Sequence, residues 1–300
     1  MHASERTSIL AELTPPFTLL RPQEQLTPVV FCSPHSGRVY PKAFLEASRL
    51  DPHTLRKSED CYVDELFEPV VALGAPLIAA RFPRAYLDVN REPYELDPRM
   101  FSGRLPPFAN TRSMRVAGGL GTIPRIVADG HDIYRGHLGP EEALRRIEWL
   151  YKPYHRMLRH LMHRTARSFG HAVLIDCHSM PSTSLSREDG GKADFVLGDR
   201  YGTSCAGVLT DLVEVALRCR GYSVVRNKPY AGGFITEHYG NPASGLHTVQ
   251  LELNRAIYMD ERRRERSPRF AQVAADFTAL ADALAQVPLG DLGPFQAAAE

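Results

Sequence analysis

Several features that would direct the interpretation elsewhere are missing from this sequence. Its five cysteines are an odd number without a CxxC pair, which argues against a disulfide framework and a cysteine-ligated zinc site. No apolar run approaches the ~20 residues that a membrane-spanning helix needs. The N-terminal residues carry charges and lack the apolar core of a secretory signal. We therefore expect a cytoplasmic protein with reduced thiols and no membrane partner.

An excess of charge of one sign is missing as well. Lys and Arg number 36 against 35 Asp and Glu, so the formal net charge is +1 and does not indicate nucleic acid as a partner. The sequence also lacks internal repeats and low-complexity linkers. With 43% hydrophobic residues the chain can bury a large core. We expect a single domain over residues 1–300, in which residues 1–24 form an N-terminal extension.

Short apolar runs alternate with longer helical patterns along the chain. Strands are predicted at residues 27–32, 75–80, 85–89, 171–176, 222–226 and 247–253. Helices are predicted at residues 60–73, 141–169, 206–220 and 271–285, with breaks near Pro69 and Pro153. Residues 92–136 are rich in Gly and Pro and predict a long loop region that is functional or contains small elements of its own. The alternation indicates an α/β sheet with helices on both faces.

Three polar side chains lie at or near the ends of predicted strands. His35 and His178 each follow an apolar strand, and Glu252 lies within the strand at 247–253. In open α/β sheets, ligands collect outside the carboxyl ends of the strands. Two histidines and one carboxylate suit a catalytic zinc site, which uses three protein ligands and keeps a fourth position for water. Taken alone, however, a histidine is more often a surface or hydrogen-bonded residue than a ligand.

The third ligand has several candidates in the sequence. Glu59 and Asp60 precede the helix predicted at 60–73, and Asp64 follows one helical turn later. We choose Asp60, because a residue at the start of that helix can face outward from the end of the sheet. Asp176 is interpreted either as structural or as a carboxylate that orients a histidine. His238 and His247 are weaker ligand candidates.

Arginines around residues 81–91 indicate an anion site. An Arg fork binds carboxylates through two parallel hydrogen bonds, and the neighbouring Asn90 adds donors to Arg91. The alternative is a surface salt bridge of small energetic value. Residues 232–239 form a polar segment with tight turns, interpreted as a loop hairpin or as a loop that covers substrate. A thiol nucleophile at Cys32 or Cys177 has little support, because buried thiols are usually inert.

The chain resembles the N-formylglutamate amidohydrolases, also called N-formylglutamate deformylases, from about residue 29 to residue 261. Seven segments in order carry this resemblance: SPHSG at 33–37, EDCYVDELF at 59–67, ARFPRAYLDVNR at 80–91, IYRG at 133–136, VLIDCHSMPS at 173–182, GGFITEHYGNP at 232–242 and HTVQLELNRAIYMDE at 247–261. The resemblance implies a relative of the zinc carboxypeptidases and aspartoacylases. Their fold is a three-layer α/β/α sandwich around a mixed, mostly parallel sheet.

The resemblance also implies a zinc-dependent hydrolase of N-formyl-L-glutamate or a similar N-acyl amino acid. One zinc ion per chain would be bound by His35, Asp60 and His178, and Glu252 of the QLE motif would be the general base. Asn90 and Arg91 match a pair that binds a substrate carboxylate, and we assign stabilisation of the oxyanion to Arg84. The expected products are formate, or another carboxylate, and the free amino acid.

The sequence departs from the histidine-degradation deformylases at residues 92–122 and at Glu237, where those enzymes commonly have Arg. Both departures concern substrate specificity rather than the reaction. One alternative is therefore a hydrolase of the same fold for another N-acyl amino acid or a short peptide. Another is a non-catalytic metal-binding or carboxylate-binding protein, against which the presence of Glu252 argues because binding needs no base. The sequence predicts no particular oligomeric state.

Overall fold

A computed structural model describes residues 11–127, 130–184, 193–287 and 292 of the chain. The chain divides into two compact units. The first unit comprises Met1–Thr18, Pro34–Glu59 and Ala79–Met157, and the second comprises Leu19–Ser33, Asp60–Ile78 and Leu158–Glu300. The expectation of a single domain over residues 1–300 stays a prediction.

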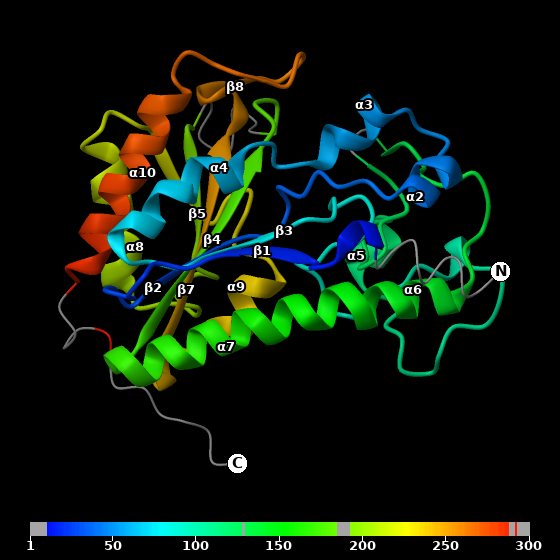
Figure 1. Cartoon of the computed structure of the whole chain (residues 1–300), viewed down its shortest axis with the longest axis horizontal. Helices are drawn as coiled ribbons and strands as arrows, with labels where there is room; N and C mark the ends of the chain where they lie inside the picture. The colour runs from blue at the N-terminus through cyan, green and yellow to red at the C-terminus, as the bar shows by residue number, and fades with distance from the viewer. Residues whose placement is uncertain (1–10, 128–129, 185–192, 288–291, 293–300) are drawn as a thin grey trace. The chain divides into compact units, whose positions relative to one another are not determined.

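A seven-stranded sheet forms the core of the fold (Figure 1). Its strand order is β1-β3-β2-β4-β7-β5-β6, with bounds β1 Phe17–Leu20, β2 Val29–Ser33, β3 Leu77–Ala80, β4 Ala172–Met180, β5 Phe195–Gly198, β6 Val224–Arg226 and β7 Leu246–Asn254. The pairs β2–β4, β4–β7 and β5–β6 are parallel, whereas β5 and β7 are antiparallel. The predicted α/β class with a mixed, mostly parallel sheet is confirmed. Strand β1 lies within the segment interpreted as an N-terminal extension.

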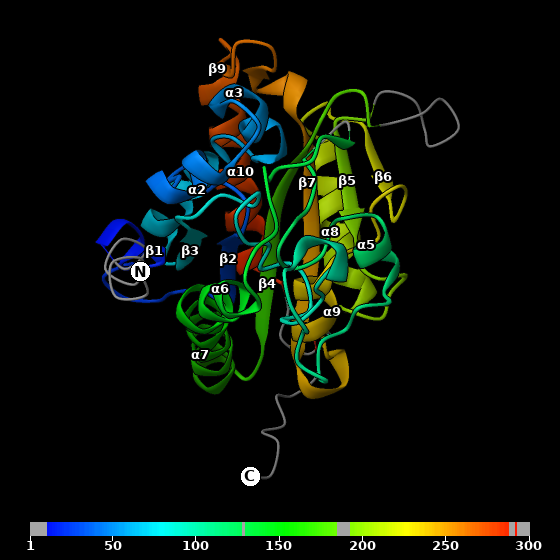
Figure 2. The same cartoon turned by 90° about the vertical axis from the view of Figure 1, so that its right-hand side faces the viewer.

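The two faces of the sheet in the second unit differ in chemistry. Helices α4 (Val63–Phe67), α8 (Gly207–Arg218) and α10 (Phe270–Ala285) lie on one side of the strands and α9 (Phe234–Tyr239) on the other (Figures 1 and 2). Under α10 the sheet presents apolar side chains such as Ile175 and Leu251. Because side chains alternate along a strand, His178 and Glu252 belong to the opposite face. The apolar face thus forms the core, and the polar face carries the candidate site residues His178 and Glu252.

Strand β4 is longer than predicted. It pairs with β7 over nine residues, from Ala172↔Leu246 to Met180↔Asn254. The sequence placed His178 after a strand that ended at Asp176, and this boundary is wrong. His178 lies inside the paired strand, and its backbone is therefore held by the sheet rather than by a loop.

Residues 85–89 do not form the strand that was predicted. The backbone N–H groups of Tyr86 and Leu87 donate to the Pro83 carbonyl, and that of Asp88 donates to the Thr122 carbonyl. The first two bonds form a turn and the third joins two irregular segments, so no strand ladder forms. Leu87 and Val89 are nevertheless fully buried, and their alternation with other residues produced a strand-like pattern in an irregular segment.

The helical predictions are largely confirmed. The helix at 60–73 divides at Pro69 into α4 and the 3₁₀ helix η2 (Glu68–Leu73), and Gly74 caps it at φ 86°. The pattern at 141–169 forms α6 (Pro140–Arg146), the π-helical η5 (Ile147–Tyr151) and α7 (Lys152–Phe169). The wider π turn ends at Tyr151, two residues before Pro153, whose missing N–H and ring disturb the regular α pattern.

The remaining elements are short. They are α2 Lys42–Ala47, α3 Pro52–Leu55, η1 Arg56–Ser58, η3 Pro98–Met100, α5 Met114–Ala117, η6 Pro242–Ser244, η7 Arg255–Ile257, and the two-stranded pair of β8 Met259–Asp260 and β9 Glu265–Arg266. Only η3 and α5 of these helices fall in the region 92–136, within the part of it that the structure describes. That region is therefore shaped mainly by turns.

Buried donors of the first unit hold the irregular segment 86–91 by its carbonyl groups. Arg146 Nη1 donates to the Tyr86 carbonyl (3.1 Å), His155 Nε2 to that of Val89 (2.8 Å), and the Tyr151 hydroxyl to that of Arg91 (2.7 Å). The Arg146 guanidinium also lies 3.8 Å from the centre of the Tyr86 ring. Such a contact adds cation–π attraction in a dry environment. The segment is thereby fixed without belonging to a helix or strand.

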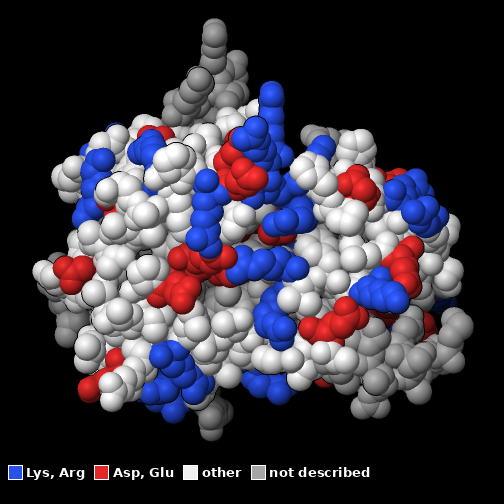
Figure 3. All heavy atoms as spheres, turned by 45° about the horizontal axis from the view of Figure 1, so that its top comes forward, with Lys and Arg blue, Asp and Glu red and all other residues white. Residues whose placement is uncertain are grey.

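The surface carries charges of both signs. On the face shown in Figure 3, basic and acidic residues are interspersed, in keeping with the formal net charge of +1. None of the helices in the described part of the chain is long and apolar enough to cross a membrane.

Candidate metal centre and active site

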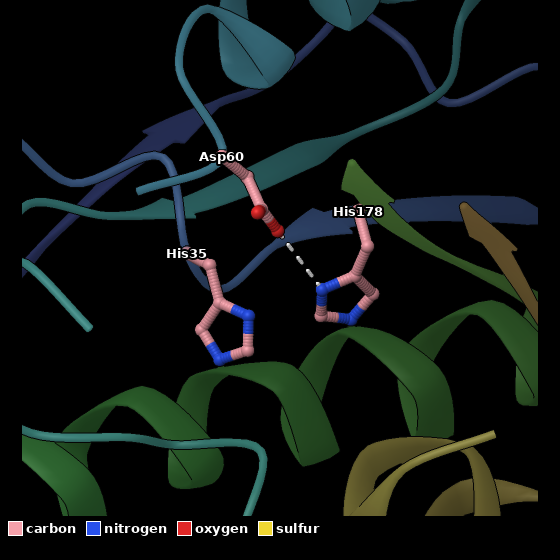
Figure 4. A group of neighbouring side chains, drawn as sticks. All are labelled: His35, Asp60 and His178. Atoms are coloured by element: carbon pink, nitrogen blue, oxygen red, sulfur yellow. Dashed lines mark hydrogen bonds and ion pairs between the residues drawn. The ribbon is translucent and has the colours of Figure 1, made fainter. Parts of the chain in front are cut away.

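Three buried side chains form a group that can hold a metal ion (Figure 4). His35, Asp60 and His178 each offer a ligand atom, and these atoms all lie within 4.8 Å of one another. The parallel pairing of β2 and β4 explains part of this proximity, because Cys32 lies opposite Asp176 in the register. His35, two residues after the end of β2, and His178, within β4, therefore lie at similar levels along neighbouring strands. Among the residues that the structure describes, no second group of His, Cys, Asp or Glu side chains with this geometry is found.

Each histidine of the group is backed by a carboxylate. His35 Nε2 lies 2.7 Å from Asp88 Oδ1, and His178 Nε2 lies 2.9 Å from Asp176 Oδ1. A carboxylate on one ring nitrogen fixes the orientation and tautomer of a histidine that binds metal through the other. In both residues Nδ1 would then be the atom that binds a metal ion. Two imidazole nitrogens and a carboxylate oxygen form a donor set that suits zinc.

Asp60 is the acidic residue of this group. Its Oδ2 lies 3.2 Å from His178 Nδ1, and its Oδ1 accepts a hydrogen bond of 3.0 Å from Arg255. Glu59, the neighbouring candidate, is buried and paired with Arg56 at 2.9 Å. The geometry thus favours Asp60 over Glu59 as the carboxylate ligand.

Burial and charge act in opposite directions on His178. Burial by itself lowers the pKa of the imidazole, but the adjacent carboxylates of Asp176 and Asp60 outweigh it and raise that pKa well above the ordinary value. Between these two carboxylates the protonated, cationic form of the imidazole is therefore more stable than the neutral form. A divalent cation bound at Nδ1 would replace the proton there, because a ligand histidine must be neutral.

Asp88 connects His35 with two arginines. Its Oδ2 lies 3.0 Å from Arg84 Nε and 3.6 Å from Arg91 Nη2, and its Oδ1 accepts from the Asn90 backbone N–H at 2.8 Å. Burial opposes ionisation, yet the cationic neighbours hold the pKa of Asp88 well below its usual range. No role for Asp88 was predicted from the sequence. The structure makes it the carboxylate that orients His35.

Arg91 is 4% exposed and firmly held. Its Nε donates to the Leu120 carbonyl (2.8 Å) and its Nη1 to the carbonyl of Asn90 (2.7 Å). Burial, only partly offset by Asp88, lowers the pKa of Arg91 to about 10, so the group is still a cation at neutral pH. Its predicted contact with a substrate carboxylate stays a prediction.

Glu252 lies beside His178 in the sheet. The two residues are direct register partners on β7 and β4, and Glu252 is 8% exposed. The guanidinium of Arg255, three residues further along the chain, contacts Asp60 and Ser179. Glu252 Oε1 accepts a hydrogen bond of 2.9 Å from the Gln250 side chain. A carboxylate next to the candidate ligands is in a suitable position for a base.

Comparison with known proteins gives the family. The family model for N-formylglutamate amidohydrolase matches residues 27–259. The chain belongs to the N-formylglutamate amidohydrolase family. It is 34% identical over 241 residues to the N-formylglutamate deformylase of Pseudomonas putida, which covers 78% of this chain and 82% of that protein. The deformylase of Pseudomonas aeruginosa is 32% identical over 237 residues, covering 78% and 83%.

Solved structures extend this result to the fold. The crystal structure of N-formylglutamate amidohydrolase from Ralstonia eutropha JMP134 matches with a TM-score of 0.84 and 39% identity, over 90% of this chain and 97% of that one. The gene product Atu2144 of Agrobacterium tumefaciens matches with a TM-score of 0.56 and 18% identity, over 91% and 95%. This second likeness shows a shared fold only.

The segment 232–239 of this family member differs from the predicted loop. It forms helix α9, whose buried residues include Thr236. Glu237 lies on its outer side, 63% exposed and 2.9 Å from Arg200. The weaker ligand candidates are engaged elsewhere: the ring of His238 stacks on Phe234, and His247 Nε2 donates to the Leu292 carbonyl.

The thiols of this family member are separate from the proposed chemistry. All five cysteines are free, and four are buried. Cys32 Sγ donates to Asp176 Oδ1 at 3.3 Å, and burial raises the pKa of the Cys177 thiol well above its ordinary value. A thiol with a raised pKa is a poor nucleophile at neutral pH. The structure therefore gives no support to a cysteine mechanism.

Proposed function

We propose that this protein is a zinc-dependent amidohydrolase that converts N-formyl-L-glutamate, or a similar N-acyl amino acid, to a carboxylate and the free amino acid. The observation that carries the proposal is the group of His35, Asp60 and His178, with both histidines oriented by carboxylates and Glu252 beside His178. The deformylase names of the relatives support the choice of substrate.

The proposed reaction adds water across an amide bond. Zinc bound by His35, Asp60 and His178 would polarise the acyl carbonyl and lower the pKa of a water molecule toward neutrality. Glu252 accepts a proton from the attacking water and delivers it to the leaving nitrogen. A C–O bond forms, the C–N bond breaks, and the amine leaves in neutral form. With a formyl group, the products are formate and the amino acid.

The arginines have the second role in this proposal. Arg84 is 28% exposed and bonded to Asp88 through Nε, and we assign the stabilisation of the developing oxyanion to it. Asn90 and Arg91 bind a substrate carboxylate and orient the amide for attack. The bonds that hold Arg91 to two backbone carbonyls keep its guanidinium pre-organised for this task.

The proposal is tested by assaying zinc-loaded protein with a panel of N-acyl amino acids and short peptides. We expect release of formate from N-formyl-L-glutamate with kcat/KM well above that for neutral N-formyl amino acids. Preference for another acyl group or for a peptide would support the sibling hydrolase instead. Binding of these compounds without turnover in the zinc-loaded protein would overturn the assignment as an enzyme.

Arg91→Lys should lower kcat/KM by roughly a hundredfold, because the charge is kept but the two-pronged contact is lost, at a cost of about 3 kcal/mol. Amidation of the substrate carboxylate should cost the native enzyme a similar factor and the Arg91→Lys variant little more. Steady-state kinetics of the four combinations measure this coupling. If the factors by which Arg91→Lys and amidation each lower kcat/KM simply multiply when the two changes are combined, Arg91 does not bind the carboxylate.

We also propose a cytoplasmic location, supported by the free cysteines. Thiol titration of denatured, unreduced protein should find all five thiols, and the native protein should expose mainly Cys219, the exposed one. Recovery of a single thiol after denaturation would indicate two disulfides and contradict this proposal.

A further inference from the structure

The side chain of Gln250 is held at both ends. It lies on β7, 4% exposed, two residues before Glu252 and on the same face of the strand. Its Oε1 accepts hydrogen bonds from the Gly233 backbone N–H (2.7 Å) and from the Thr236 hydroxyl (3.3 Å). Its Nε2 donates to Glu252 Oε1 (2.9 Å).

These partners determine which way the amide of Gln250 points. The oxygen and nitrogen of a side-chain amide are assigned from their hydrogen-bond partners. A backbone N–H can only donate, so the Gln250 atom that meets Gly233 must be the oxygen. The NH₂ group is thereby directed at Glu252. A glutamine turned the other way would set its oxygen against a carboxylate and leave the Gly233 N–H facing a donor.

Helix α9 supplies the fixed donors. Gly233 is its N-terminal flanking residue, and Thr236, which is fully buried, lies in its first turn. The Thr236 hydroxyl lies 3.4 Å from Asp176 Oδ2 as well as 3.3 Å from Gln250 Oε1. Its single proton serves one of these acceptors at a time. The start of α9 therefore contacts both Asp176, the carboxylate bonded to His178, and Gln250, the amide bonded to Glu252.

We propose that Gln250 is a positioning residue, held by Gly233 and Thr236, that fixes the carboxylate of Glu252 for proton transfer. The proposal rests on the proposed function of Glu252 as the base. It gives the segment GGFITEH (residues 232–238) of this chain a role, because Gly233 and Thr236 orient a side chain on the polar face of the sheet. Hydrogen bonds to a charged acceptor are among the stronger ones in proteins, so their loss should reduce turnover.

Gln250→Leu removes the donor and retains a side chain of similar bulk. We expect kcat to fall by about ten- to a hundredfold, with KM and zinc content within about twofold of the native values, as for loss of a hydrogen bond to a charged group. In the Glu252→Gln background, the same change should cost less than about threefold, because a residue that acts through Glu252 has nothing further to lose. Thr236→Ser, which keeps the hydroxyl, should retain more activity than Thr236→Val.

Thr248→Val is the matched control. Thr248 is fully buried, two residues before Gln250 in β7, and its hydroxyl has no hydrogen-bond partner among the described residues. This variant should stay within about twofold of native kcat, since it removes a buried hydroxyl without a contact. If Glu252→Gln is impaired but Gln250→Leu lowers kcat by the same factor in both backgrounds, the positioning role is wrong. If Glu252→Gln keeps native kcat, the proposed function of Glu252 is wrong, and this inference with it.

Discussion

Glu252→Gln should lower kcat by about 10²–10⁴-fold, with zinc content and substrate affinity close to native. Glutamine has nearly the same shape as glutamate and retains hydrogen bonding, but it cannot accept the proton of the attacking water. The loss should therefore fall on the chemical step. Steady-state kinetics, metal analysis and ligand binding to the same preparations separate these effects.

The competing explanation for Glu252 is a structural ionic contact. In that case Glu252→Gln would lower the melting temperature and leave kcat of the folded fraction near the native value. Glu237→Gln is a useful comparison, because Glu237 is a largely exposed carboxylate paired with Arg200. Surface pairs of this kind contribute little to stability, so this variant should match the native enzyme in both assays. Normal turnover by Glu252→Gln would refute the base assignment.

His178→Ala should reduce zinc occupancy sharply and abolish most activity. It removes one of the three proposed protein ligands, and it leaves Asp60 and Asp176 without the imidazole that each of them contacts. Even loss of an outer partner of a metal ligand costs about 10–100-fold in affinity or activity, so loss of the ligand itself should cost more. Treatment of the native protein with a chelator should reproduce the loss of activity, and zinc should restore it.

His171→Ala provides the matched control for His178→Ala. His171 is also a buried histidine and immediately precedes β4, but it does not belong to the metal-binding group. Its replacement should leave zinc content unchanged. Circular dichroism of both variants checks that the fold is retained. Full zinc content in folded His178→Ala would show that the ligand assignment is wrong.

The strands that carry the candidate ligands could be predicted because their signal is local. The strands predicted at 27–32 and 171–176 contain the continuous apolar runs VVFC (29–32) and AVLI (172–175), as expected for strands buried on both faces. His35 and His178 were found by their place after these runs. The end of β4 could not be predicted, because its last residues remain in the strand through pairing with β7, which depends on residues about seventy positions away.

Other features depend on contacts that leave no local pattern. Asp88 orients His35 across 53 residues of sequence, from a segment that belongs to no regular element. Its alternation predicted a strand, although turn hydrogen bonds compete successfully with any ladder there. Helix α9 has only six residues, which is too short for helical periodicity to distinguish it from a polar loop. Its contacts with Gln250 and Asp176 appear only when the strands are assembled.

The register of β4 against β7 has a consequence for how this family can diverge. His178 and Glu252 are direct partners, so their backbone separation is the spacing of adjacent strands, about 4.8 Å. Deleting or inserting one residue upstream of either side chain within its strand would turn it to the apolar face. Length changes should therefore be eliminated by selection in these two strands, whereas the turns of residues 92–136 can absorb them. We expect substrate preference to change through that region while the spacing between the proposed ligand His178 and the proposed base Glu252 stays the same.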